Sequence, residues 1–113
     1  MAATPPSTPL HTLTIEKAVA EDGTPTLLCR GRFIVDTCGQ LRTEVKALSP
    51  NHKLVQADMS GVDYVDSAGL GSLLGTFISA KRDGCHLELI NVNRRVRDLL
   101  DLTKLAPILE DKG

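Results

Sequence analysis

At 113 residues, the chain is long enough for one globular domain and too short for two of ordinary size, and such a domain buries roughly two-thirds of its unfolded surface. With 42% hydrophobic and 24% charged residues, the composition excludes a disordered chain and a membrane-embedded one. The net charge of −1 gives no field that would attract nucleic acid or a membrane surface, so we expect neither as a partner.

The three cysteines give no sign of a disulfide framework or a metal site. Cys29, Cys38 and Cys85 are odd in number, lack CxxC spacing and have no histidine cluster nearby in the sequence. We expect buried or half-buried thiols in a reducing compartment, and no metal or other cofactor.

The first ten residues, MAATPPSTPL, contain three prolines and mostly small or polar side chains. They lack the basic and apolar regions of a secretory signal, and no run in the chain approaches the ~18 apolar residues of a membrane span. We therefore expect a cytoplasmic protein with a mobile tail over residues 1–10 and one domain over residues 11–113.

The domain opens with two short apolar runs, residues 13–19 and 26–33. The turn residues Asp22-Gly23 and Pro25 separate them, which predicts a β-hairpin.

A first amphipathic helix is predicted after the hairpin. Thr37 and Gln40 have the spacing of a capping box. Apolar residues then recur at helical spacing until Ser49-Pro50 ends the run: Leu41, Val45 and Leu48.

A strand over residues 53–59 and a second helix come next. The helix is the most strongly patterned segment of the chain, with Lys81 and Arg82 in its last turn and Gly84 as its stop. Its predicted apolar face consists of Leu70, Leu73, Leu74, Phe77 and Ile78.

The remaining elements are a strand over residues 86–92 and a third helix, followed by a short apolar piece at residues 107–109 that we expect to close the sheet. The third helix has Val96, Leu99, Leu100 and Thr103 on one side. Strands alternating with helices of about 10 to 15 residues predict an α/β fold, a mixed sheet with parallel pairs and crossover helices after an antiparallel start.

Ser67 lies where the third strand meets the second helix, within VDYVDSAGLGSLLG, and has three interpretations. In the first, Asp66 or Ser67 caps the helix, which is worth about 1 kcal/mol. A cap does not explain Gly69 and Gly71, because each costs up to ~1 kcal/mol in a helix relative to alanine. These glycines indicate a close backbone approach or a surface without side chains.

In the second interpretation Ser67 is the nucleophile of a hydrolase. Val65 occupies the position where the G-x-S-x-G motif needs its first glycine. None of the three histidines, His11, His52 and His86, is plainly placed as the base that such a serine requires. We therefore predict no catalytic residues and no enzyme activity.

In the third interpretation Ser67 accepts a regulatory phosphate. A helix N-terminus tolerates the added charge, and small neighbours leave the hydroxyl accessible. The modified protein should stay folded while ~1.5 to 2 negative charges appear beside Asp66, which would repel an acidic or closely packed partner.

The segment Asp66-Ser67-Ala68-Gly69-Leu70-Gly71, after a strand ending in Asp58-Met59-Ser60-Gly61-Val62, resembles the signature of the STAS domain in the bacterial anti-sigma factor antagonists. The similarity extends through Leu73-Leu74, residues 87–92 and NRRVRDLLDLTKL, and covers about residues 11 to 110.

This resemblance implies a single-domain STAS fold without catalytic activity, in which Ser67 is the phosphoacceptor. One implied partner is an anti-sigma factor kinase with a histidine-kinase-like ATPase fold. The unphosphorylated antagonist binds this kinase, and a sigma factor is freed. The other implied partner is a metal-dependent phosphatase that removes the phosphate. ATP would belong to the kinase. The implied partner-binding residues are Asp66, Ser67, Ala68, Gly69, Leu70 and Gly71, on a surface formed by a loop over residues 60–71 and the start of the second helix.

The chain departs from the family pattern at one place. Many members carry an aspartate soon after the glycine that ends the second strand, where this chain has Ile34, with Asp36 two residues later. Either Asp36 replaces that acid in partner binding or recognition differs.

Two alternatives stay open. In the first, the chain is a STAS subunit of another assembly, an ABC lipid transporter or a stress-signalling complex.

The second alternative concerns the start of the third helix. Arg94, Arg95 and Arg97 form a docking patch or, as we favour, a solvated helix face. The only aromatic residues, Phe33, Tyr64 and Phe77, provide no platform for stacking bases.

Overall fold

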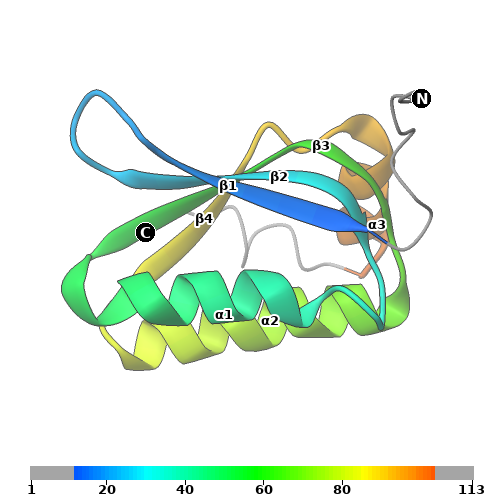
Figure 1. The fold of residues 1–113 in the computed structure, drawn as a ribbon. Helices are drawn as coiled ribbons and strands as arrows, with labels where there is room; N and C mark the ends of the chain where they lie inside the picture. The colour runs from blue at the N-terminus through cyan, green and yellow to red at the C-terminus, as the bar shows by residue number, and fades with distance from the viewer. Residues whose placement is uncertain (1–11, 104–113) are drawn as a thin grey trace, which may run out of the picture.

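The computed structural model describes residues 12–103, which form four strands and three α-helices around one sheet (Figure 1). The predicted tail at residues 1–10, His11 and the predicted closing piece at residues 107–109 lie outside the described residues.

The sheet has the strand order β1-β2-β3-β4. β1 (Leu13–Val19) pairs antiparallel with β2 (Pro25–Phe33), which confirms the predicted hairpin. β2 pairs parallel with β3 (Leu54–Val65), and β3 pairs parallel with β4 (His86–Ile90). The predicted mixed sheet is therefore confirmed within the described residues.

The crossover helices between the parallel strands cover one face of this sheet (Figure 1). α1 (Gly39–Leu48) and α2 (Ser67–Arg82) form the crossovers between the parallel strands, and a 3-10 turn (Ser49–Asn51) follows α1. α3 (Arg94–Thr103) contacts β3 near one end of the sheet. Among the described residues, no helix is both long and apolar enough to cross a membrane.

The core lies mostly between the sheet and α1 and α2. Fully buried side chains from strands and helices meet there, including Leu27, Phe33, Leu41, Met59 and Leu73. The predicted apolar face of α2 is confirmed at Leu73 and Phe77 but wrong at Ile78, which is exposed, because α2 packs on one side only.

The capping box predicted for α1 is wrong. Cys38 is the N-cap residue, and no side chain caps it. The Thr37 hydroxyl instead donates a hydrogen bond to Arg32 O at 2.5 Å and accepts one from Ile34 N–H at 3.1 Å. The side chain therefore closes the turn between β2 and α1 and does not cap the helix.

β3 is longer than predicted. The strand continues through Ser60-Gly61 to Val65, so residues 60–65 are strand and not part of a loop. The pairing register with β2 shifts between Leu28 and Arg30, where the regular ladder is interrupted by a β-bulge or similar irregularity. At Gly61 a Cβ atom would lie 2.8 Å from Cys29 O, so glycine allows the two strands to stay paired.

Asp83 joins the end of α2 to the end of α1 and gives the fold a testable pH dependence. Its Oδ2 accepts hydrogen bonds from Ser49 Oγ at 2.6 Å and from Lys46 Nζ at 3.0 Å. These bonds, that of Ser49 first, hold the pKa of Asp83 below its ordinary value. The carboxylate therefore contributes stability above its unfolded pKa of about 3.9, and this contribution is lost as pH falls through the folded pKa.

We expect Asp83→Asn to lower the thermal unfolding midpoint at pH 7 relative to wild type, with a difference that shrinks at about pH 3. Circular dichroism melts across this range measure the effect. A difference that stays constant with pH would mean that the charge of Asp83 plays no part in the linkage.

Candidate functional site

The site forms where β3 ends and α2 begins. Asp66 is the N-cap residue of α2, and its Oδ1 accepts a hydrogen bond from Gly69 N–H at 2.7 Å. Its backbone N–H donates to Phe33 O, at the end of β2, at 3.0 Å. Of the two residues predicted as possible caps, Asp66 is the cap and Ser67 is not.

Ser67 is the first residue of α2 and is exposed. Its hydroxyl makes no side-chain hydrogen bond within residues 12–103. Because Asp66 already satisfies the helix N-terminus, the Ser67 hydroxyl has no structural task in the described part of the chain. The hydroxyl is therefore accessible from solvent for modification.

The turn between β2 and α1 lies beside this helix N-terminus. Asp66 Oδ2 accepts a hydrogen bond from Val35 N–H at 3.3 Å, and Asp36 follows in the same turn and is exposed. Ser72 Oγ also donates to Cys38 O at 3.0 Å, so the start of α1 lies against the second turn of α2. Asp36 and Ser67, 31 positions apart in the sequence, therefore belong to neighbouring segments.

The predicted site residues differ in what they present to a partner. Ser67, Ala68 and Gly71 are exposed, and Asp66 and Leu70 are half-buried. Gly69 is buried, and a Cβ atom there would lie 2.1 Å from Phe33 O. The two glycines thus have the two uses that the sequence indicated, a close backbone approach at Gly69 and an open surface at Gly71.

The hydrolase interpretation finds no geometric support among the described residues. His52 lies just before β3, with Nδ1 3.0 Å from Leu48 O, and His86 begins β4, with its ring edge-to-face against Phe77. Both lie at the start of the parallel pair β3 and β4, where Leu54 pairs with His86, whereas Ser67 follows the far end of β3, and twelve residues of a strand span roughly 40 Å. Neither histidine can act as the base for Ser67.

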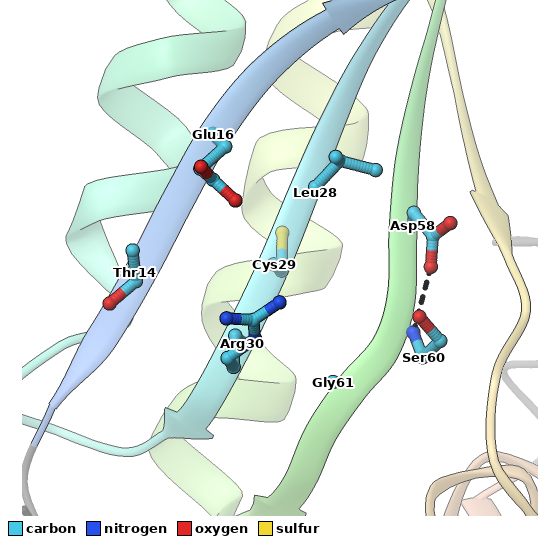
Figure 2. A pocket seen from close by; sticks show the side chains of 8 residues that line it. All are labelled: Thr14, Glu16, Leu28, Cys29, Arg30, Asp58, Ser60 and Gly61. Carbon is cyan, nitrogen blue, oxygen red and sulfur yellow. Dashed lines mark hydrogen bonds between the residues drawn. The ribbon is translucent and has the colours of Figure 1, made fainter. Parts of the chain in front are cut away.

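A hollow lies on the face of the sheet opposite α1 and α2 (Figure 2). It is lined by Thr14, Glu16, Leu28, Cys29, Arg30, Asp58, Ser60 and Gly61. Burial, with a smaller effect of the Asp58 charge, raises the pKa of Cys29 to about 12, so the thiol stays protonated at neutral pH and is a poor nucleophile. Within residues 12–103, no group of three or more potential ligands is arranged to hold a metal ion.

The cysteines are buried or half-buried, as the sequence predicts. Cys29 and Cys85 are buried and Cys38 is half-buried, and all three are free thiols. The three arginines at the start of α3 are exposed, which both a docking patch and a solvated face require. Sequence analysis missed Asn93, whose side chain accepts from Val96 N–H at 2.9 Å and donates to Val62 O, so that it caps α3 and ties it to β3.

Comparisons with known proteins agree with this geometry. Residues 17–110 match the family model described as Mlab, STAS domain. The anti-sigma-B factor antagonist of Bacillus subtilis (strain 168) is 32% identical over 80 residues, 71% of this chain and 73% of that protein.

Two solved structures share the fold. An anti-sigma factor antagonist from Mycobacterium paratuberculosis has a TM-score of 0.76 at 18% identity, covering 91% of this chain and 87% of that one. The Bacillus cell fate determinant SpoIIAA in its phosphorylated form has a TM-score of 0.63 at 16% identity, covering 83% and 86%.

Proposed function

The chain belongs to the STAS domain family, and from this premise we propose that it is an anti-sigma factor antagonist whose binding is switched by phosphorylation of Ser67. The observation that carries the proposal is the exposed Ser67 hydroxyl, which has no structural task because Asp66 caps α2. Its relatives support the assignment, since one is an anti-sigma-B factor antagonist and a structural neighbour is known in a phosphorylated form.

In this proposal the protein acts in the cytoplasm and catalyses nothing itself. Unphosphorylated protein binds an anti-sigma factor kinase with a histidine-kinase-like ATPase fold, and the sigma factor is freed. The kinase supplies ATP and phosphorylates Ser67, and a metal-dependent serine phosphatase restores the hydroxyl.

The docking face consists of one turn and the start of one helix. Its members are Asp36, Asp66, Ser67, Ala68, Gly69, Leu70 and Gly71. The buried Gly69 and half-buried Leu70 support the exposed members from beneath. Small side chains at Ala68 and Gly71 let a partner approach the helix N-terminus closely, and a phosphate on Ser67 would occupy that space.

A phosphate at this position changes the docking face without unfolding the protein. The partial positive charge of the α2 N-terminus favours an anion on the first helical residue. The same phosphate places like charge next to the carboxylates of Asp66 and Asp36, so that an acidic surface of the partner is repelled.

A second candidate keeps the fold and changes the partner. The chain would then be the STAS subunit of an ABC lipid transporter or a stress-signalling complex. The description of the matching family model, which names Mlab and not an antagonist, is the observation that favours it.

The test is a pull-down from the native host with wild-type, Ser67→Ala and Ser67→Asp protein, with partners and Ser67 phosphate identified by mass spectrometry. We expect a kinase-like ATPase to be retained by the alanine variant and lost by the aspartate variant, and wild-type protein to carry phosphate on Ser67. Recovery of a transporter or a large complex equally by all three would establish the second candidate instead.

A further inference from the structure

Val35 is an apolar side chain exposed directly beside the docking face. It lies in the turn between β2 and α1 and is 69% exposed. Isolated exposed apolar residues are common on proteins, so exposure by itself has no meaning. Two further features distinguish Val35: the rigidity of its turn and the hydrogen bond that joins it to Asp66.

The turn that carries Val35 is fixed on both sides. Ile34 is buried, and its carbonyl accepts hydrogen bonds from Thr37 N–H at 2.9 Å and Cys38 N–H at 2.8 Å. The Thr37 hydroxyl closes the turn through Ile34 N–H and Arg32 O. A turn whose backbone is held in this way needs little further ordering when a partner binds it.

The position of Val35 is set by the residue that precedes Ser67. Val35 N–H donates to Asp66 Oδ2, while Asp66 Oδ1 caps α2. One carboxylate therefore holds both the turn with Val35 and the helix with Ser67. Two acidic residues form a rim beside Val35: Asp36, the next residue of the turn, and Asp66, which accepts its N–H.

We propose that Val35 is the apolar anchor of the docking face and inserts into an apolar pocket of the kinase that is bordered by lysine or arginine side chains. This inference rests on the proposed function. An aliphatic side chain that becomes fully buried at the centre of an interface contributes through the apolar area removed from water. The acidic rim selects basic groups at the edge of the partner's pocket.

The anchor is tested by titrating the purified kinase-like ATPase with unphosphorylated wild-type, Val35→Ala, Val35→Ile and Val35→Lys protein by isothermal calorimetry. We expect Val35→Ala to bind about tenfold more weakly, from the two methyl groups lost, and Val35→Ile to bind within a few-fold of wild type. We expect Val35→Lys to bind about a hundredfold more weakly, because a buried ammonium would meet basic groups.

Val19→Lys is the matched control. Val19 is 73% exposed at the end of β1 that pairs with Pro25, the opposite end of β2 from the docking face. This variant should bind as wild type does, and all five proteins should melt at the same temperature. If Val35→Ala and Val35→Lys bind as tightly as wild type, or if Val19→Lys is weakened equally, the anchor alone is wrong. If the ATPase binds neither wild type nor Ser67→Ala, both the proposed function and the anchor are wrong.

Discussion

Gly69→Ala should lower the free energy of unfolding by about 2 kcal/mol or more, above the roughly 1 kcal/mol typical of single substitutions. The added Cβ atom would lie 2.1 Å from Phe33 O and 2.7 Å from Phe33 C. Both are backbone atoms, so no side-chain rotation relieves the contact. Because Phe33 is fully buried in the core and its carbonyl accepts from Asp66 N–H, the start of α2 would have to move away from β2.

The matched control is Gly71→Ala, two residues further along α2. A Cβ atom at this position has nothing within 4 Å, and alanine favours the helix over glycine by up to about 1 kcal/mol. Urea denaturation of the two variants should therefore give changes of opposite sign. Equal stabilities for both would show that the close approach of α2 to Phe33 is not a constraint on the fold.

The elements with strong local patterns could be predicted from the sequence. The hairpin, the alternation of strands with helices and the apolar positions Leu73 and Phe77 follow from residue periodicity alone, and the structure confirms them. The resemblance seen in residues 66–71 is confirmed by the family match over residues 17–110. These features depend on residues that are close together in the sequence, and so they can be predicted from it.

The features that the sequence did not predict depend on competing contacts, one within a turn and one between distant strands. Thr37 has the spacing of a cap, but the turn after β2 offers its hydroxyl a better partner in Arg32 O. Ser60-Gly61 reads as a loop because glycine disfavours a strand, yet Gly61 is required where β3 passes Cys29 and Arg30. At Thr37 a local side-chain to backbone hydrogen bond competes with the cap, and at Gly61 a tertiary contact overrides a local preference.

In the candidate site, the sequence predicted that a side chain caps α2 but did not predict which of two adjacent residues does so. A helix N-terminus with an aspartate followed by a serine leaves the cap undecided, since either side chain serves well. The structure assigns the cap to Asp66, whose carboxylate also reaches Val35 N–H. No sequence signal pointed to Val35, because a single valine in a turn is unremarkable until its exposure and its tie to Asp66 are known.

Ser67→Asp should weaken binding of the kinase-like ATPase about tenfold or more at low ionic strength. Two unit charges about 6 Å apart repel by about 3 kcal/mol at an effective dielectric of about 20, and about 1.4 kcal/mol corresponds to a tenfold change in affinity. Ser67 is exposed, so solvent and salt screen part of this repulsion, and we take the tenfold figure as the expected loss.

Ser67→Asn separates the charge from the size of the new side chain. Asparagine has nearly the shape of aspartate without its charge, so a charge switch predicts that Ser67→Asn keeps most of the affinity while Ser67→Asp loses it. Raising the salt concentration to about 1 M should narrow the gap between the two variants, because the Debye length then falls to about 3 Å, below the ~6 Å between the charges. Equal losses in both variants at every salt concentration would assign the effect to steric exclusion at the close-packed start of α2, and would count against a switch that acts through charge.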